Sequence, residues 1–392
     1  MGALSHIKVL DLSRVLAGPW ASQILADLGA EVIKIERPVV GDDTRSWGPP
    51  FLKDSAGKDT AESAYFLCTN RGKQSVCVDM KTAEGRDTIR QLADQCDVVL
   101  ENFKVGGAAK FGLDYETLRA RNPGLIYCAI TGFGQNGPDK DRPGYDFLVQ
   151  AMGGLMSVTG QPDDTPGAGP QKVGVALTDI MTGLYATIGI LAALAERDRS
   201  GQGQFVDLAL LDVTAATLAN QASNYLVGGT VPTRLGNAHP NIVPYQSFVA
   251  ADGHLIVAVG NDAQFCRFVE ALDLAELALD ERFATNRARV ENRDTLVPLL
   301  QRKMLERGKD EWLHILEGIK VPAGPINSID AVFDEPQIQA REMVVGFDHP
   351  CGSRLQVVGN PIKLSRTPVT YPSPPPTLGQ HTAEVLAKIR PR

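Results

Sequence analysis

The sequence predicts an α/β fold, with a large domain built on a mostly parallel sheet and a smaller α+β domain. Short apolar strands alternate with helical segments of about ten residues between residues 7 and 131, which is typical of βαβ units. Glycine and proline stand where these segments begin and end. Near residue 222 the alternation gives way to a hairpin pattern followed by longer amphipathic helices.

The elements of the large domain follow one another in a regular order. The predicted strands are IKVLDL (7–12), EVIKIE (31–36), SVCVDM (75–80), DVVLENF (97–103) and LIYCAIT (125–131). Helices are predicted at 18–30 and 84–96. The first helix has Pro19 near its start and Gly29 near its end, which is the usual punctuation of a helix.

Composition shifts divide the chain into three stretches. Residues 1–222 are expected to form the first part of the large domain, 223–321 the small domain, and 322–392 a return to the large domain. Within the small domain, residues 248–260 have the pattern of a hairpin. The amphipathic helices of this domain are predicted at 263–272 and 293–318. The tail is expected to form an extended return strand and a last short helix.

The composition excludes several classes of protein. The 392 residues carry 39 Lys and Arg against 46 Asp and Glu, a net charge of −7, which disfavours nucleic acid as a partner. No apolar stretch approaches the roughly 18 residues of a membrane span, so we interpret the run Thr182–Leu194 as a buried helix. The N-terminal residues lack a signal-peptide pattern, which favours the cytoplasm. Six cysteines without CxxC spacing indicate buried free thiols, and neither disulfides nor a metal site is expected.

Asp179 stands at the start of this apolar run. Helical periodicity begins after it and ends near Ser200 and Gly201, so Asp179 is expected to cap the helix, with Thr178 as the alternative capping residue. A carboxylate at a helix N-terminus beside an apolar wall also suits a nucleophile. The two interpretations are compatible.

Basic residues follow several of the predicted strands. In an open α/β sheet the carboxyl ends of the strands form the ligand crevice, so these cations suggest an anion such as a nucleotide phosphate. Ordinary solvated surface is the alternative. The residues are Arg37, Arg71, Lys73, Lys104 and Lys110.

Three glycines after the strand at 125–131 have GxGxxG spacing. They are Gly132, Gly134 and Gly137, and Pro138 follows where a dinucleotide fingerprint requires a helix. A glycine turn at the strand end, or a loop over a ligand, is therefore the preferred interpretation.

The segment GDDTRSWGPPF places Arg45 and Trp47 on a loop rich in proline and glycine. This loop is either a surface turn or a specificity loop whose arginine binds a carboxylate. The chain contains neither the GxSxG motif of a serine hydrolase nor the HExxH motif of a zinc hydrolase.

Several long motifs occur in order along almost the whole chain. They include IKVLDLSRVLAGPWASQILADLGAEVIKIERP, CDVVLENF, RPGYDFLVQAMGGLMSVTG and VGVALTDIMTGLYA, and continue through GNAHPNIVPYQSF to the terminal LGQH. Together they resemble the family III CoA-transferases, the group of formyl-CoA:oxalate and carnitine CoA-transferases. Within that family, GDDTR, WGPPF and IVPYQ are similar to the branch that moves CoA from succinyl-CoA to glutarate.

The resemblance implies that Asp179 is the nucleophile. It would attack the thioester carbonyl and form an aspartyl acyl anhydride, and returning CoA thiolate would convert this to an aspartyl-CoA thioester. CoA would enter as a thioester substrate, with no tightly bound cofactor. The implied CoA contacts are Val15, Ala17, Arg37, Arg71, Lys73, Asn102, Phe103 and Lys110.

The resemblance also implies residues that contact the acyl group and the acceptor acid. They are Arg45, Trp47, Tyr145, Asp146, Gly260 and Asn261. Gly260 and Asn261 match a loop that covers the reactive carboxylate, and Arg45 is the expected partner of the distal carboxylate of a dicarboxylate acceptor. Oxalate is not expected as the acceptor, because Leu16 and Pro143 stand where the oxalate branch has Gln and Lys.

The architecture implied by the resemblance is a Rossmann-like large domain in an interlocked homodimer, with the active site between one subunit's large domain and its partner's small domain. Two other functions remain open. An α-methylacyl-CoA racemase of the same fold would have a His-Asp pair in place of Tyr145 and Asp146, and tyrosine is a poor base at neutral pH. A non-catalytic acyl-CoA-binding protein would not need Asp179.

Overall fold

The chain forms two compact units in a computed structural model that describes residues 2–389. The first unit contains the residues up to Leu155, the segment Val173–Leu218 and the residues from Pro336 onward, and the second contains Met156–Lys172 and Ala219–Glu335. The expected boundaries at 222/223 and 321/322 therefore move to 218/219 and 335/336. The segment 156–172, expected in the large domain, belongs to the second unit.

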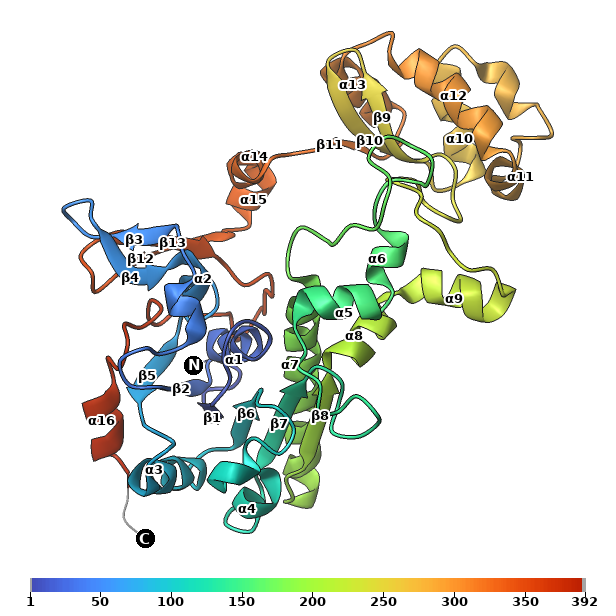
Figure 1. Cartoon of the computed structure of the whole chain (residues 1–392). Helices are drawn as coiled ribbons and strands as arrows, with labels where there is room; N and C mark the ends of the chain where they lie inside the picture. The colour runs from blue at the N-terminus through green and yellow to red at the C-terminus, as the bar shows by residue number, and fades with distance from the viewer. Residues whose placement is uncertain (1, 390–392) are drawn as a thin grey trace. The chain divides into compact units, whose positions relative to one another are not determined.

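The first unit is built on a sheet of six parallel strands in the order β5-β2-β1-β6-β7-β8 (Figure 1). The strands are β1 (Lys8–Asp11), β2 (Glu31–Glu36), β5 (Lys73–Cys77), β6 (Val98–Glu101), β7 (Ile126–Thr131) and β8 (Phe205–Ala209). The predicted α/β class with a parallel sheet is confirmed, and β8 is an edge strand beyond the five predicted ones. Because the chain runs outward from β1 in both directions, the loops after β1 and β6 diverge.

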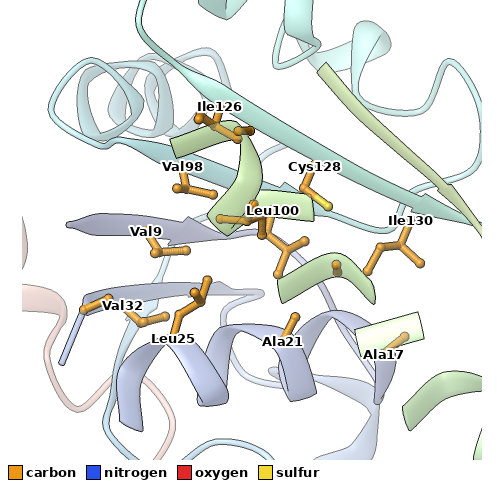
Figure 2. Packing of buried hydrophobic residues seen from close by; sticks show 14 of the residues in the cluster. Val9, Ala17, Ala21, Leu25, Val32, Val98, Leu100, Ile126, Cys128 and Ile130 are labelled. Atoms are coloured by element: carbon orange, nitrogen blue, oxygen red, sulfur yellow. The ribbon is translucent and has the colours of Figure 1, made fainter. Parts of the chain in front are cut away.

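Helices cover both faces of this sheet, as the alternation of the sequence predicted. On one face lie α1 (Ala17–Asp27) and α7 (Leu177–Ser200), and on the other lie α3 (Ala83–Ala93), α4 (Tyr115–Arg119) and α16 (Thr382–Ala387). Ala21 and Leu25 of α1 face Val9 and Leu100 of the sheet (Figure 2). Successive strand residues are buried against opposite helical layers, which is why most residues of the central strands are apolar.

The 24-residue helix α7 is long and apolar enough to cross a membrane. Core helices of soluble proteins can have the same length and hydropathy, so this is only weak evidence of a membrane span. Its residues Ala186 and Ile190 are fully buried against the sheet. On the opposite side, Ile188 is 61% exposed and Leu184 is 38% exposed. The interpretation of this helix as buried is therefore correct for one face only.

The remaining elements of the first unit flank the sheet. Its two hairpins are β3 (Phe51–Lys53) with β4 (Asp59–Ser63), and β12 (Val344–Asp348) with β13 (Arg354–Val358). Its short helices include α2 (Ala64–Leu67), α5 (Asp146–Met152), α8 (Leu210–Thr217) and α15 (Pro336–Ala340), while α6 (Leu155–Val158) begins at its last residue before the second unit. The expected single return strand in the tail is thus a hairpin, and the last short helix is α16.

The second unit has a three-stranded antiparallel sheet in the order β11-β10-β9. The strands are β9 (Tyr245–Ala250), β10 (Gly253–Ala258) and β11 (Ala323–Pro325), and the helices are α9 (Ala219–Gly228), α10 (Asp262–Ala271), α11 (Asn286–Glu291), α12 (Arg293–Met304), α13 (Lys309–Gly318) and α14 (Ile329–Asp334). Phe248, Phe265 and Trp312 pack in its own core. The predicted hairpin and amphipathic helices are confirmed, with α12 and α13 replacing one longer helix.

All six cysteines are free thiols, as predicted. Cys96 and Cys128 are buried. Cys68 and Cys266 are exposed, so burial does not extend to the whole set.

Candidate active site

A crevice forms where the loops after β1 and β6 diverge. Asn102 ties the two loops together: its Oδ1 accepts the Arg14 N–H at 2.9 Å, and its Nδ2 donates to the Arg14 carbonyl at 2.7 Å. The next residue, Val15, has a φ of 71°, a left-handed conformation that is strained for a β-branched side chain. The double hydrogen bond therefore holds a strained turn in the wall of the crevice.

A cavity of 440 Å³ opens at this point, entirely within the first unit. Its wall is formed by the loops after β1, β6 and β7 and by the first turn of α7. The basic residues that line it are Arg14, Lys104, Lys110, Lys140 and Arg142. The acidic residues in the wall are Asp43 and Asp179. This excess of cations suits an anionic ligand.

Asp179 borders the cavity from the third residue of α7. The helix begins at Leu177 after Ala176, so the prediction that Asp179 or Thr178 caps it is wrong. Asp146 of α5 supplies the capping oxygen instead: its Oδ1 accepts the Thr178 N–H at 2.8 Å and the Asp179 N–H at 3.3 Å. The carboxylate of Asp179 is thus not used as the cap.

The surroundings of Asp179 stabilise the protonated form of its carboxyl group. Burial, and then the neighbouring charge of Asp146, raise the pKa of Asp179 to about 7. The helix N-terminus does not reverse this effect, because Asp146 already accepts the first N–H groups that face it. A carboxyl group that titrates near neutral pH inside a cavity is a candidate for a nucleophile or a base.

Tyr65 lies within electrostatic reach of the same carboxyl group. Burial, and then the charge of Asp179, raise the pKa of Tyr65 to about 12. Its hydroxyl therefore stays protonated at neutral pH and is available as a hydrogen-bond donor. The ring of Tyr65 packs edge-on against Trp47, with 5.2 Å between centroids. Tyr65 could not be predicted from the sequence, because no motif marks the short helix α2.

The glycines after β7 shape the opposite wall. A Cβ on Gly132 would lie 2.5 Å from the Cα of Gly144, so the two backbones approach more closely than any other residue permits. Gly134 and Gly137 have positive φ angles of 87° and 84°. The interpretation of this motif as a glycine turn at a strand end is confirmed.

This backbone contact fixes the segment that carries Arg142 and Tyr145 into the cavity wall. The Arg142 guanidinium lies 5.1 Å from the centre of the Phe133 ring. Asp139 is its ion-pair partner at 3.2 Å, with both side chains largely exposed. Arg142 therefore combines a fixed position with a weak, solvent-screened partner.

Residues 4–382 match the sequence profile of CoA-transferase family III. The chain belongs to this family. It is 52% identical over 386 residues to a succinate–glutarate CoA-transferase of Agrobacterium fabrum, covering 98% of this chain and 95% of that protein. It is 44% identical over 386 residues to the succinyl-CoA:glutarate CoA-transferase of Homo sapiens, covering 98% and 86%. The crystal structure of a CAIB/BAIF family protein from Brucella suis, 50% identical, matches with a TM-score of 0.86 over 99% of this chain and all of that one.

The enzyme is thus a CoA-transferase that takes CoA thioesters as substrates, and the structure gathers part of the expected CoA site. Five of the expected contacts line the cavity together with Asp179: Val15, Ala17, Asn102, Phe103 and Lys110. The side chain of Asn102 is occupied by Arg14, so it shapes the site rather than offering its amide to a ligand.

The other three expected CoA contacts lie outside the wall of this cavity. Arg71 is buried and forms two hydrogen bonds with Asp27, at 2.9 and 2.6 Å. Lys73 is fully buried, with its Nζ 3.2 Å from Asp11 Oδ2. The premise that these two residues follow a strand is wrong, because β5 begins at Lys73. Arg37 does follow β2, but it pairs with Asp43 at 2.6 Å.

Arg45 is not available to a substrate carboxylate in this structure. Its guanidinium is buried and donates to Glu36 at 2.7 and 2.8 Å and to Glu62 at 2.8 Å. It also stacks 3.6 Å from the centre of the Phe66 ring. The arginine of the expected specificity loop is therefore part of an internal ionic cluster, whereas Trp47 of the same loop is 43% exposed.

Gly260 and Asn261 lie in the second unit at the start of α10. Asn261 caps this helix by accepting the Gln264 N–H at 2.9 Å, and Gln264 Oε1 accepts the Gly260 N–H at 2.7 Å. This is a local capping arrangement. The covering of Asp179 by this loop stays a prediction.

Three cations in the cavity wall were not predicted as site residues: Arg14, Lys140 and Arg142. Arg14 follows β1 directly, so the rule that selected Lys104 and Lys110 would have found it. Lys140 and Arg142 lie farther along a charged loop, and only the contact between Gly132 and Gly144 brings that loop back to the strand end. Among residues 2–389, no group of His, Cys, Asp and Glu side chains has the arrangement of a metal site.

Proposed function

We propose that this enzyme transfers CoA from succinyl-CoA to glutarate or to a dicarboxylate of similar length, with Asp179 as the group that carries first the acyl moiety and then CoA. The observation that carries the proposal is the position of Asp179 in a cation-lined cavity at the crevice between β1 and β6. The names of the curated relatives support the choice of donor and acceptor.

The reaction proceeds through two covalent forms of Asp179. Its carboxylate attacks the succinyl thioester carbonyl, the C–S bond breaks and CoA leaves as thiolate, giving a succinyl-aspartyl anhydride. The thiolate attacks the aspartyl carbonyl of the anhydride and releases succinate, leaving an aspartyl-CoA thioester. Glutarate then attacks this thioester, and the released thiolate takes the glutaryl group from the second anhydride. Thioester energy is retained throughout, and water is the competing nucleophile that the site must exclude.

The CoA moiety is assigned to the side of the cavity that follows β6. Phe103 offers an apolar ring, which contacts Phe111 with 6.4 Å between centroids. Lys104 and Lys110 stand beside it in the wall and suit the phosphates. Tyr65 is proposed to donate its hydroxyl to the oxygen that becomes negative when Asp179 attacks.

The distal carboxylate of the dicarboxylate is assigned to Arg142. Arg45, the residue predicted for this role, is enclosed by Glu36 and Glu62. Arg142 lines the same cavity as Asp179 and lies three residues before Tyr145, whose neighbour Asp146 contacts the Asp179 backbone. A guanidinium can bind a carboxylate through two hydrogen bonds.

We further propose that the enzyme is a cytoplasmic homodimer. An apolar cavity of 1030 Å³ in the first unit is lined by the exposed side of α7, including Leu184 and Ile188, and by β13. An opening of this size lined mostly by carbon is typical of a surface that a second chain covers. The interlocked arrangement of the family is the expected form of this contact.

The test is to mix the enzyme with succinyl-CoA and a panel of free acids and to measure new acyl-CoA by mass spectrometry. The panel contains glutarate, malate, itaconate, oxalate and carnitine. Glutaryl-CoA is expected from the wild-type enzyme and not from Asp179→Asn. Formation of other acyl-CoA products without glutaryl-CoA would refute the acceptor assignment, and equal yields from Asp179→Asn would refute the nucleophile. Inversion at the α-carbon of a branched acyl-CoA without exchange would favour the racemase.

A further inference from the structure

The start of α7 is held in place by side chains of another helix. Asp146, the first residue of α5, directs Oδ1 to the Thr178 and Asp179 N–H groups at 2.8 and 3.3 Å. Its Oδ2 accepts the amide of Gln150 at 2.7 Å. Gln150 is fully buried, and its Oε1 accepts the Val173 N–H at 2.9 Å. A continuous set of hydrogen bonds therefore joins α5 to the segment that leads into α7.

The first N–H groups of any helix lack partners within the helix, and a side chain just before the helix commonly accepts one of them. In α7 that position is Ala176, which has no side chain able to do so. Asp146 of α5 accepts these N–H groups in place of a residue at the start of α7, and its negative charge is favourable at a helix N-terminus. One of the two N–H groups that it binds belongs to Asp179 itself.

We propose that Asp146 is a positioning residue of the transfer reaction: its carboxylate fixes the first turn of α7 and thereby holds the carboxylate of Asp179 towards the cavity. This inference rests on the proposed function, in which Asp179 is the nucleophile. It differs from the prediction that Asp146 contacts the substrate, because Asp146 is not among the residues that line the cavity and both of its carboxylate oxygens have partners within the protein.

The position of Asp146 also has an electrostatic consequence. Its charge adds to burial in keeping the proton on Asp179. The charges of Asp179 and Asp146 also act on Tyr65 of α2, and both raise its pKa. The other titratable or charged side chains around the cavity are Arg14, Asp43, Lys104, Lys110, Lys140, Arg142 and Tyr145. Removal of the charge of Asp146 alone should therefore make Asp179 easier to ionise.

Two substitutions separate the hydrogen bonds of Asp146 from its charge. Asp146→Asn keeps an oxygen that accepts the Thr178 and Asp179 N–H groups but removes the charge, whereas Asp146→Ala removes both. The matched control is Thr82→Ala, which deletes the cap of α3, where Thr82 Oγ1 accepts the Gly85 N–H at 3.0 Å. This control loses a helix cap of the same unit away from the wall of the cavity.

The experiment measures kcat, KM and the pH profile of glutaryl-CoA formation, together with amide hydrogen exchange at residues 177–180. We expect Asp146→Ala to lower kcat by about 100-fold with KM for succinyl-CoA little changed, and to speed exchange at these amides. Asp146→Asn should restore most of kcat and exchange protection and move the acid limb of the profile to lower pH by about half a unit to one unit. Thr82→Ala should change neither kcat nor the pH of the acid limb of the profile.

Three results would overturn the inference. The first is an unchanged kcat in Asp146→Ala. The second is an equal loss of kcat in Asp146→Asn and Asp146→Ala while both variants keep their protection from exchange. The third is amide exchange at residues 177–180 that is the same in all variants. Asp146→Asn preserves the oxygen that accepts the Thr178 and Asp179 N–H groups and loses only the bond from Gln150, because its Nδ2 is itself a donor. It therefore still tests the inference where Asp146→Ala does not fold. If the wild-type enzyme transfers CoA to no acid, the proposed function fails, and the exchange data still decide whether Asp146 fixes the first turn of α7.

Discussion

The carboxyl group of Asp179 experiences two opposing effects. A position in the first turn of a helix favours the carboxylate, whereas burial and the charge of Asp146 favour the protonated acid. Burial and Asp146 prevail, and the pKa of Asp179 rises to about 7. The reactive form is therefore in balance with the protonated form at neutral pH.

The first prediction concerns the pH dependence of catalysis. Because Asp179 attacks as a carboxylate, kcat/KM for succinyl-CoA should fall by about tenfold for each pH unit below about 7 and level off above it. A profile that is flat between pH 5 and pH 8 would contradict the raised pKa. Initial rates in buffers of constant ionic strength provide the measurement.

The raised pKa of Asp179 also predicts that the ionised form needed for activity makes the folded protein less stable. The pKa of Asp179 in the folded protein lies above the ordinary value of 3.8, so the folded protein binds the proton more tightly than the unfolded chain does. The free energy of unfolding therefore falls as pH rises from about 4 to about 7. Asp179→Asn should therefore raise the free energy of unfolding at pH 8 by about 1–4 kcal/mol, and much less at pH 5. Thermal denaturation of both proteins at the two pH values provides the measurement. A stabilisation that does not depend on pH would argue against an ionised, poorly solvated Asp179.

Arg142 tests the assignment of the acceptor carboxylate. Loss of a hydrogen bond to a charged group predicts that Arg142→Ala raises KM for glutarate by about 10- to 100-fold. Affinity for free CoA should change little, because its phosphates are assigned to Lys104 and Lys110. Arg142→Lys should be intermediate, since lysine keeps the charge but loses the paired hydrogen bonds. Weaker CoA binding with an unchanged KM for glutarate would move Arg142 to the phosphate site.

At the scale of the elements, the loop after β1 is held by Asn102. Asn102→Ala removes two hydrogen bonds to Arg14 and frees the strained turn at Val15. We expect KM for succinyl-CoA to rise by about tenfold with a smaller effect on kcat. Asn122→Ala is the matched control, because Asn122 donates to the Cys96 carbonyl at 3.0 Å outside the wall of the cavity. Equal effects of the two substitutions would show that Asn102 has no special role.

Strands and helices of the sheet were predictable because each has a strong local pattern. The strands at 31–36 and 125–131 are rich in β-branched residues, and Gly29 lies just after α1 with a φ of 107°. The start of α7 was not predictable in this way. Its cap is Asp146, 30 or more residues away in the chain, and local sequence carries no signal for such a partner.

In the candidate site too, residues marked by local sequence were predictable and those that depend on contacts between distant residues were not. Val15 and Phe103 were expected from the family resemblance, and Lys110 also from its place after a predicted strand. All three line the cavity, because the loops after β1 and β6 meet at the crevice. Arg45 and Lys73 were misassigned, because a charged side chain in the sequence gives no indication of whether an internal carboxylate already binds it. The buried acids Glu36 and Asp11 decide this, and only the folded chain brings them together with their partners.

At the scale of the whole molecule, the apolar side of α7 predicts association. Ile188→Lys places a charge in the apolar cavity and should abolish the homodimer or its folding. Leu279→Lys is the control, since Leu279 is 86% exposed in the second unit and its substitution should be silent. Sedimentation equilibrium provides the measurement. A monomeric wild-type enzyme with full activity would refute the homodimer.

The central claim is that Asp179 forms a covalent bond to the acyl group and then to CoA. The most direct measurement is to incubate the enzyme with succinyl-CoA and no acceptor, add hydroxylamine to trap activated carboxyl groups, and map the modified peptide by mass spectrometry. If Asp179 is the nucleophile, a hydroxamate forms at Asp179 and its formation requires succinyl-CoA. Rapid CoA exchange with no modification of Asp179, or with the modification at another residue, would contradict it.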